Sequence, residues 1–384
     1  ECILDLIKPS DKVILVSRHY LGSINHTLLS HQMLSHRNID HGILFIGDEH
    51  PTTEAIIEKM TGIKAIGRIP HLKEVTPKTI RSVADRLKIN ILNELQLKNQ
   101  VMKKRTLALM QEDKKNIWHP LTQHKLVEGL LPIKKAKAEH LYDTEGRTYI
   151  DGIASWYTSM FGHCHPKIID AVSDQMKELD QIVFSGFTHE PAIKLSQELL
   201  EILPDEQTKL FFNDNGSTAT EVGIKMALQY HSNRGKDKDV LLAFEDGFHG
   251  DTLGAMSASG ISVYNGAFEK HFLEVKRIPK PNGNNNEAII EQLEKLISEH
   301  RIAGFIYEPL VQGAAGMKFY DAEGLGMILQ TCKENGIICI ADEVMTGFGK
   351  TGKLFASEFL SIQPDIICMS KALSAGMVPM GITS

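Results

Sequence analysis

The fold is decided by Ile337-Ile338-Cys339-Ile340-Ala341, which runs into Asp342, and by Ile366-Ile367-Cys368-Met369, which runs into Ser370-Lys371. Both runs read as buried strands, because each is short, continuous and apolar. Open α/β sheets bind their ligands beyond the carboxyl ends of their strands. We therefore expect the carboxylate and the amine that follow the two runs to lie at a ligand-binding edge.

A carboxylate and an amine in this arrangement suit a pyridine-ring cofactor held as an imine. Asp342 would keep the ring nitrogen protonated, and Lys371 would form the imine. Pyridoxal 5'-phosphate is therefore the first candidate cofactor. The alternative is that both are ordinary loop residues, because acids and lysines at strand ends commonly do no more than solvate a turn.

The composition is that of an ordinary globular protein. Of its 384 residues, 42% are hydrophobic and 23% are charged, and a chain of this length suggests roughly two or more domains. The net charge of -6 gives no electrostatic reason to bind nucleic acid, and no basic stripe with interleaved aromatic residues is present. We therefore expect a small-molecule enzyme with no nucleic-acid partner.

Cysteine usage points to a reducing compartment. The count is odd and no C-x-x-C pair occurs, which argues against a disulfide framework. No apolar run approaches the roughly 20 residues needed to span a bilayer, and no signal peptide is recognised. The expected location is the cytoplasm, with no membrane contact. The cysteines are Cys2, Cys164, Cys332, Cys339 and Cys368.

Three parts are expected along the chain. Residues 1–97 read as a partial α/β domain, residues 98–113 as a charged helical linker, and residues 114–384 as the main domain. The first part alternates strands and helices, which is typical of a parallel sheet, but it contains no G-x-x-x-x-G-K-[ST] phosphate loop. Its expected strands are 12–17, 41–46 and 65–70, and its expected helices are 24–36 and 53–60.

A cluster of small polar residues, Gly216-Ser217-Thr218, lies between an expected strand at 209–212 and an expected helix at 219–230. Backbone N–H groups and the positive dipole end at a helix N-terminus bind phosphate. We therefore interpret these three residues as the cradle for the cofactor phosphate. The alternative is an ordinary N-cap, since Ser, Thr and Asn are favoured there whatever the function.

An aromatic residue also follows a strand end. Phe248-His249-Gly250 comes just after the expected strand at 240–244, and glycines loosen the loop around it. Phe248 could lie flat on the cofactor ring, with His249 beside it. The alternative is an aromatic residue at the edge of the core, which single phenylalanines usually are.

Two further motifs are weak. His163-Cys164-His165 raises the question of a metal, but no further ligand follows at finger-like spacing and Pro166 suggests a turn, so we expect no metal site. Gly349-Lys350-Thr351 looks like the end of a phosphate loop, but Val344 stands where that motif needs its first glycine.

Several motifs, taken in order, carry a family resemblance: Asn215-Gly216-Ser217-Thr218-Ala219-Thr220-Glu221, Phe248-His249-Gly250-Asp251-Thr252, Glu308-Pro309, Ala341-Asp342-Glu343-Val344, Gly347-Phe348-Gly349 and Ser370-Lys371. From about residue 112 onward the chain resembles the class III, fold-type I aminotransferases. The resemblance implies an α/β fold, the large domain of a pyridoxal-phosphate-dependent transferase, with a mostly parallel sheet and helices on both faces. It also implies that Lys371 carries the cofactor, that Asp342 serves the ring nitrogen, and that Glu308 lies on the oxygen side of the ring.

Aromatic residues narrow the resemblance within that class. Ile117-Trp118-His119-Pro120 and Ser155-Trp156-Tyr157, followed by Gly162 and His165-Pro166, are similar to adenosylmethionine-8-amino-7-oxononanoate aminotransferases of biotin synthesis. That resemblance implies S-adenosylmethionine and 8-amino-7-oxononanoate as substrates. It also implies a wide, apolar-walled pocket to which Trp118, Trp156, Tyr157 and Lys350 contribute.

The N-terminal part carries a resemblance of its own. Residues 20–29 and 67–72 are similar to the second half of dethiobiotin synthetase, which implies a partial P-loop-type α/β domain and a bifunctional biotin-synthesis protein. ATP and Mg²⁺ would be needed only if that half is complete in the parent protein. Ile46 stands where an adenine-reading Asn is expected.

The chain departs from the class III pattern at three positions. Phe248 replaces the usual Tyr, Leu121 a frequent Tyr, and Lys350 a frequent Arg, and a lysine cannot reproduce the bidentate grip of arginine. The resemblance implies a homodimer, with a C-terminal domain expected to be missing after Ser384. The alternatives are another class III ω-aminotransferase, acting on ornithine, 4-aminobutyrate or a similar amine, and an inactive fragment.

Overall fold

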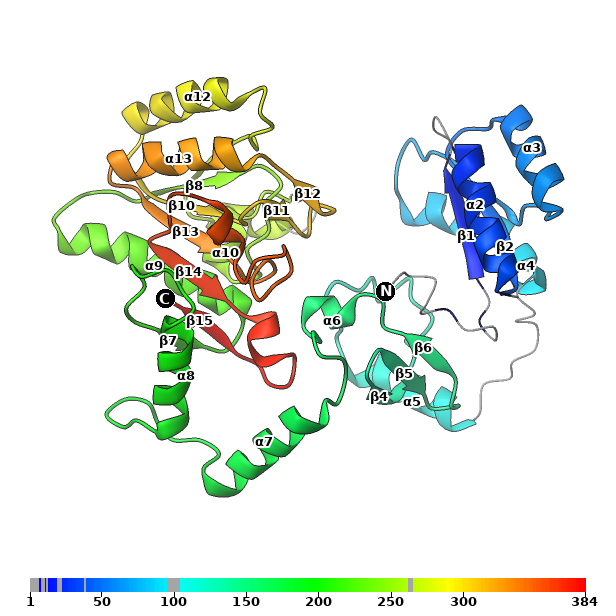
Figure 1. The fold of residues 1–384 in the computed structure, drawn as a ribbon, viewed down its shortest axis with the longest axis horizontal. Helices are drawn as coiled ribbons and strands as arrows, with labels where there is room; N and C mark the ends of the chain where they lie inside the picture. Colours follow the sequence, from blue (N-terminus) through cyan, green and yellow to red (C-terminus); the bar gives the residue numbers. More distant parts are fainter. Residues whose placement is uncertain are drawn as a thin grey trace. The chain divides into compact units, whose positions relative to one another are not determined.

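The computed structural model describes residues 7, 11, 13–18, 23–37, 39–94, 104–261 and 265–384. It divides into two compact units, Glu1–Pro132 and Ile133–Ser384 (Figure 1). The linker expected at 98–113 stays a prediction, because residues 98–103 lie outside the described part and the rest belongs to helix α5 (Lys104–Asn116). Other expectations on Cys2, Lys12 and residues 20–22 also lie outside the described residues.

The first unit contains a three-stranded parallel sheet in the order β1-β2-β3, as predicted. Apolar residues of β2 alternate between its two faces: Leu44 packs with Val83 and Leu87, and Phe45 packs with Ile57. The sheet therefore carries a small core on each side. Its elements are β1 (Val13–Arg18), α2 (Ser23–His36), β2 (His41–Ile46), α3 (Pro51–Thr61), β3 (Gly67–Ile69) and α4 (Pro77–Glu94).

The second unit is organised around a seven-stranded sheet in the order β7-β15-β14-β13-β10-β8-β9. The strands from β14 to β9 are parallel, and β15 is antiparallel to both of its neighbours. A mostly parallel sheet is what the sequence predicts. The strands are β7 (Phe211–Asn213), β8 (Val240–Phe244), β9 (Val275–Ile278), β10 (Ile302–Tyr307), β13 (Ile338–Asp342), β14 (Ile366–Met369) and β15 (Gly381–Thr383).

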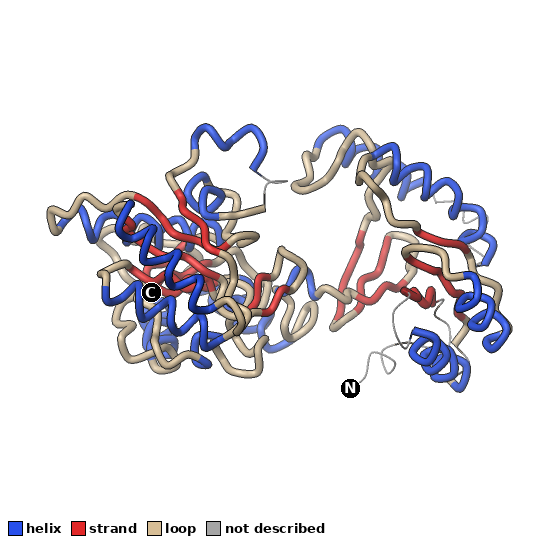
Figure 2. The backbone as a smooth tube through the Cα atoms, turned by 90° about the horizontal axis from the view of Figure 1, so that it is seen from above, coloured by secondary structure: helices blue, strands red, loops and turns tan. Residues whose placement is uncertain are grey.

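Helices cover both faces of this sheet (Figures 1 and 2). On one face, α9 (Gly216–Asn233) packs on alternate strand residues such as Leu241 and Ile340. On the other face, α12 (Asn286–Glu299) and α13 (Ala322–Glu334) pack on the strand residues that point the opposite way, such as Phe305. Because both faces are buried, the central strands are continuously apolar.

Shorter elements complete the second unit. Strands β4, β5 and β6 form a three-stranded antiparallel sheet, and β11 and β12 form a two-stranded hairpin. The bounds are β4 (Ile133–Lys137), β5 (His140–Asp143), β6 (Thr148–Ile150), α6 (Ala154–Tyr157), α7 (Pro166–Glu178), α8 (Glu190–Leu200), α10 (Leu253–Ala258), η1 (Gly266–His271), β11 (Val311–Gln312), β12 (Lys318–Phe319), η2 (Ala356–Phe359) and η3 (Lys371–Ser374).

One boundary differs from the sequence prediction. Helix α9 begins at Gly216, not at 219, because Asn215 is its N-cap: its side chain accepts a hydrogen bond from Thr218 N–H, and Thr218 returns one to the Asn215 backbone. The glycine and serine of the expected cradle therefore form the first turn of the helix. Within the described residues, no helix is long and apolar enough to cross a membrane.

Candidate active site

The two strand ends singled out by the sequence are neighbours in the sheet. Asp342 is the last residue of β13 and lies opposite Cys368 of the parallel strand β14. Lys371 follows three positions later, at the start of η3. The structure therefore brings the acid and the amine to the same carboxyl edge, where α/β sheets bind ligands.

A histidine pairs with the buried acid. Nδ1 of His249 donates to Oδ2 of Asp342 at 2.8 Å, and both side chains are buried. Two hydrogen bonds hold the backbone of His249. Its N–H donates to Oγ of Ser259, and its carbonyl accepts from the hydroxyl of Thr220. His249 thus has a fixed orientation from which it holds Asp342. Among the described residues, nothing pairs with its Nε2.

Glu308, which follows β10, connects two loops of the site. Its Oε1 accepts from Phe248 N–H at 3.0 Å, and its Oε2 accepts from Gly313 N–H at 2.9 Å. Burial raises the pKa of Glu308 to about 7, although the nearby His249 acts in the opposite direction. Glu308 therefore fixes the backbone of Phe248 at the site.

The surroundings of Lys371 favour a neutral amine. Burial lowers the pKa of Lys371, while the carboxylates of Asp342 and Glu308 oppose this shift. Its Nζ lies 5.7 Å from the centre of the Tyr157 ring. An amine with a lowered pKa is a better nucleophile and a better base at neutral pH.

The predicted phosphate cradle is the first turn of α9. The N–H of Thr218 donates to the side chain of Asn215, so Thr218 takes part in the cap as its N3 residue. The N–H groups of Gly216 and Ser217 have no partner within the helix, because the first turn offers none. Gly250 packs so closely here that a Cβ would lie 2.4 Å from Oγ of Ser217, and its φ is +126°.

The residues predicted to bind substrate lie in different elements and differ in how exposed they are. Trp156 and Tyr157 lie in α6, and Trp156 is 55% exposed. Nζ of Lys350 lies 3.7 Å from Sδ of Met160, and burial, together with the charge of Lys371, lowers its pKa to about 8. Trp118 belongs to the first unit and is 90% exposed, so its role stays a prediction.

The backbone of α6 is unusual. Its four residues have φ values of 46°, 48°, 61° and 72°, which is one turn of left-handed helix. Each L-residue in this conformation costs roughly 1–2 kcal/mol, and such runs persist only where the surroundings hold them. No periodicity or propensity in the sequence signals this turn.

Sequence reasoning missed one buried acid. Glu343 is fully buried and accepts hydrogen bonds from the N–H and hydroxyl of Ser357, from Ala356 N–H, and from the hydroxyl of Thr346. Burial raises its pKa, and the hydrogen bonds act against that shift. It ties η2 to the end of β13 and so supports the loop that carries Lys350. The position of Glu343 directly after Asp342, at the end of a buried strand, was the signal in the sequence that could have indicated it.

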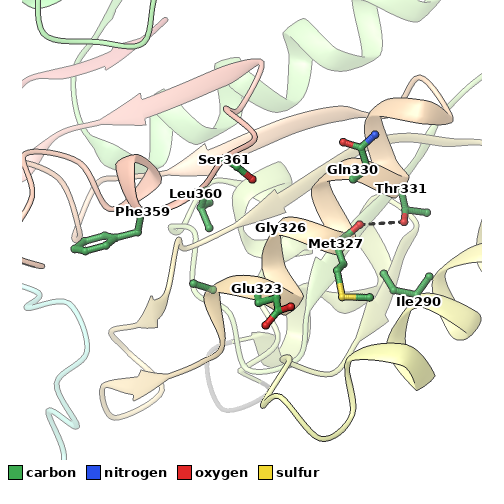
Figure 3. A pocket seen from close by; sticks show the side chains of 10 residues that line it. Ile290, Glu323, Gly326, Met327, Gln330, Thr331, Phe359, Leu360 and Ser361 are labelled. Atoms are coloured by element: carbon green, nitrogen blue, oxygen red, sulfur yellow. Dashed lines mark hydrogen bonds between the residues drawn. The ribbon is translucent and has the colours of Figure 1, made fainter.

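The weaker motifs have structural roles or none. Nε2 of His163 pairs with Asp151 at 2.8 Å, and the described part of the chain contains no cluster of three or more His, Cys, Asp or Glu side chains suited to a metal. A groove of about 680 Å³ on α13 is lined by residues such as Met327 and Phe359 (Figure 3), and it includes none of the predicted site residues.

Comparison with known proteins decides the family. The profile of the family described as Aminotransferase class-III matches residues 122–383. The chain belongs to the class-III aminotransferases. A second profile, described as AAA domain, matches residues 1–79, which is consistent with a segment similar to dethiobiotin synthetase.

Curated relatives of this class-III aminotransferase share one name. The adenosylmethionine-8-amino-7-oxononanoate aminotransferase of Synechococcus elongatus is 42% identical over 276 residues, which cover 70% of this chain and 65% of the relative. That of Geobacter sulfurreducens is 37% identical over 294 residues, covering 72% and 65%. The chain therefore spans about two thirds, 65%, of the length of these relatives.

Solved structures agree with the family. An adenosylmethionine-8-amino-7-oxononanoate aminotransferase from Methanocaldococcus jannaschii matches with a TM-score of 0.67 at 35% identity, covering 72% of this chain and 65% of that one. An amine transaminase from an uncultivated Pseudomonas species, solved with pyridoxal phosphate bound, matches with a TM-score of 0.66 at 29% identity, covering 70% and 64%.

Class-III aminotransferases depend on pyridoxal phosphate, and the residues present here fit that cofactor. A buried carboxylate, Asp342, is held by His249 and can pair with a ring nitrogen. Lys371 offers an amine with a lowered pKa, and the first turn of α9 offers N–H groups for a phosphate. Because residue 250 is a glycine, its loop can pack directly against Ser217 in that turn. A Cβ at this position would lie 2.4 Å from Oγ of Ser217.

Proposed function

We propose that this class-III aminotransferase transfers an amino group from S-adenosylmethionine to 8-amino-7-oxononanoate, giving 7,8-diaminononanoate. The observation that carries the transamination chemistry is the meeting of Lys371 with the Asp342–His249 pair at one edge of the sheet. The choice of substrates is supported by the names of curated relatives at 42% and 37% identity.

Lys371 and Asp342 have distinct roles in this proposal. Bound pyridoxal phosphate supplies an electron sink for the bond broken at the substrate carbon. The neutral amine of Lys371 would take the proton from that carbon and deliver it to C4′ of the cofactor, and its lowered pKa favours the first of these transfers. Asp342, held by His249, keeps a proton on the ring nitrogen.

The remaining residues bind and orient. Gly216 and Ser217 at the start of α9 offer their N–H groups to the phosphate, and Thr218 fixes the turn that presents them through its bonds to Asn215. Phe248 stacks on the ring, and Glu308 fixes the backbone of Phe248 and lies on the oxygen side of the ring.

Substrate binding is assigned to Trp156, Tyr157 and Lys350, and the family resemblance assigns Trp118 to it as well. Trp156 and Tyr157 supply apolar walls beside Lys371, which is supported by the 5.7 Å approach of Nζ to the Tyr157 ring. Lys350 offers a positive charge to a substrate carboxylate at pH values below about 8.

The test is an absorbance spectrum of the intact parent protein loaded with pyridoxal phosphate, before and after S-adenosylmethionine is added without acceptor. Loss of the visible band of the bound aldehyde form, with growth of the near-ultraviolet band of the amine form, supports both the chemistry and the donor. A band that ignores S-adenosylmethionine but responds to ornithine or another ω-amine contradicts the substrate assignment. A spectrum and activity unchanged in Lys371→Ala would contradict the chemistry.

We propose in addition that residues 1–97 are the second half of a dethiobiotin-synthetase-like domain, and that the parent protein is bifunctional. The match of an AAA domain to residues 1–79 and the parallel order β1-β2-β3 support this. ATP and Mg²⁺ would act there only with a phosphate loop supplied by the parent protein. Assaying the parent protein for ATP-dependent synthesis of dethiobiotin tests the assignment.

We further propose that the protein works as a homodimer in the cytoplasm. Large apolar side chains between residues 153 and 187 are exposed, which supports a subunit interface on this segment. All four cysteines in the described part are free thiols, which supports a reducing compartment. Sedimentation of the parent protein tests the dimer. The apolar residues are Ile153, Trp156, Phe161, Met176, Val183, Phe184 and Phe187.

A further inference from the structure

The carboxylate of Asp151 gathers three hydrogen bonds on one oxygen. Its Oδ2 accepts from Ser155 N–H at 2.8 Å, from the Ser155 hydroxyl at 2.9 Å, and from Nε2 of His163 at 2.8 Å. The side chains of His163 and Asp151 are only 17% and 7% exposed. Burial raises the pKa of Asp151, but the bonds from His163 and Ser155 outweigh it and leave the pKa below its ordinary value.

This carboxylate holds the left-handed turn of α6. Ser155 is the second of the four residues with positive φ, and both its N–H and its hydroxyl are bound to Asp151. A left-handed run of L-residues is intrinsically unfavourable and persists only where tertiary contacts over-determine it. The bonds from Ser155 to Asp151 are contacts of this kind.

The backbone of His163 is bound to the turn between β4 and β5. Its N–H donates to the Ala138 carbonyl at 2.7 Å, and its carbonyl accepts from Ala138 N–H at 2.9 Å. Gly162 passes so close to this turn that a Cβ would lie 2.8 Å from the Ala138 Cα. The backbone of His163 is therefore fixed, and its imidazole approaches Asp151 from a rigid base.

The other end of the turn faces the reactive amine. Tyr157, the last residue of α6, places its ring 5.7 Å from Nζ of Lys371. The next residue, Thr158, packs against Gly376, where a Cβ would lie 3.0 Å from the threonine hydroxyl. The turn is thus in contact with the segment that carries Lys371.

We propose that His163 is a positioning residue: through Asp151 it holds the left-handed turn of α6 and thereby keeps Tyr157 against the amine of Lys371. This inference rests on the proposed function for its meaning in catalysis. Within the motif His163-Cys164-His165, His163 therefore serves as a structural clamp on the active site.

The test uses the full chain and compares His163→Phe, which removes the donor, with His163→Gln, whose Nε2 can replace it. Asp174→Asn is the matched control, because it removes an ion pair of the same 2.8 Å length that is exposed. All variants carry Trp118→Phe, which leaves Trp156 as the single tryptophan of a chain that has two. Circular dichroism checks that each variant is folded.

Three readouts, measured without cofactor, follow the clamp and its link to Lys371. In His163→Phe, amide hydrogen exchange at Ser155 should accelerate on the order of tenfold, as expected for loss of one charge-assisted hydrogen bond, and acrylamide should quench Trp156 more strongly. In the same variant, acetic anhydride should label Lys371 several-fold faster relative to the exposed Lys177. His163→Gln should restore all three values, and Asp174→Asn should leave them unchanged.

The outcomes separate this inference from the proposed function. Unchanged exchange and quenching in His163→Phe would overturn the clamp, and a loosened turn with unchanged labelling of Lys371 would overturn its link to the amine. Failure of His163→Gln to restore the values that His163→Phe changes would show that bulk, not the hydrogen bond, is responsible, and would also overturn it. None of these readouts depends on which substrate the enzyme uses.

Discussion

Oδ2 of Asp342 lies 2.8 Å from Nδ1 of His249, and the two side chains are 5% and 1% exposed. An acid buried this deeply needs a donor, because an unpaired polar group inside a protein loses the hydration it had in the unfolded chain. Val344 N–H supplies a second donor, to Oδ1 at 3.1 Å. His249 is therefore the side-chain partner on which the orientation of Asp342 depends.

Replacing His249 by Leu should weaken both the fold and the cofactor site. The change leaves Oδ2 of Asp342 without its donor, which costs about 1–3 kcal/mol of unfolding free energy. Urea unfolding measures that loss, and titration with pyridoxal phosphate should show weaker binding. His249→Asn is the control, because its Nδ2 can stand near the position of Nδ1. If the asparagine variant were as impaired as the leucine variant, the hydrogen bond would not be the cause.

Glu308 should make stability depend on pH in a definite direction. Its pKa is raised from 4.5 to about 7 by burial, so between these values the folded state binds a proton that the unfolded state has lost. Stability therefore falls as pH rises from about 4.5 to about 7, by roughly 3 kcal/mol for this group, and is flat on either side.

The comparison with Glu308→Gln isolates this contribution. The amide does not titrate, so the difference in unfolding free energy between wild type and variant should change across this pH window. Urea unfolding at several pH values from 4 to 8 measures it. A difference that stays constant over that range would show that the pKa of Glu308 is the same in the folded and unfolded states.

The strand ends were predictable from sequence because burial leaves a strong signal. Continuous apolar runs before Asp342 and Lys371 indicate strands buried on both faces, and polar residues just after them mark a ligand-binding edge. Phe248 and His249 were predicted in the same way, from their place after the end of β8. The parts of the site that follow from sheet topology were therefore accessible without a structure.

What the sequence did not reveal depends on contacts between distant residues. The bond from Asp151 to His163 spans twelve positions, and the left-handed turn of α6 is imposed by it against local preference. Propensity describes one residue at a time and cannot anticipate this arrangement. The early start of helix α9 is a different case, because the reciprocal cap between Asn215 and Thr218 is local and was among the alternatives that the sequence offered.

Lys350 should make substrate affinity depend on pH. Burial and the charge of Lys371 lower its pKa to about 8, so the amine is charged below this pH and neutral above it. If Lys350 binds the carboxylate of 8-amino-7-oxononanoate, KM for this substrate should rise as pH passes about 8. In Lys350→Arg the charge persists to high pH, so KM should be lower and should not rise there. Parallel profiles for the two proteins would exclude Lys350 from carboxylate binding.

Gly250→Ala should damage the phosphate cradle. The added Cβ would lie 2.4 Å from Oγ and 2.7 Å from Cα of Ser217, and the φ of +126° is one that alanine avoids. Because backbone as well as side chain must move, we expect a loss of about 1–3 kcal/mol in stability, together with weaker binding of inorganic phosphate and of pyridoxal phosphate.

Gly235→Ala is the control, since its φ is +66° and no atom lies within 4 Å of the added Cβ. It should lose stability through backbone strain alone and bind both ligands normally. Equal loss of binding in the two variants would mean that strain, and not the close packing of Gly250 on Ser217, accounts for the effect.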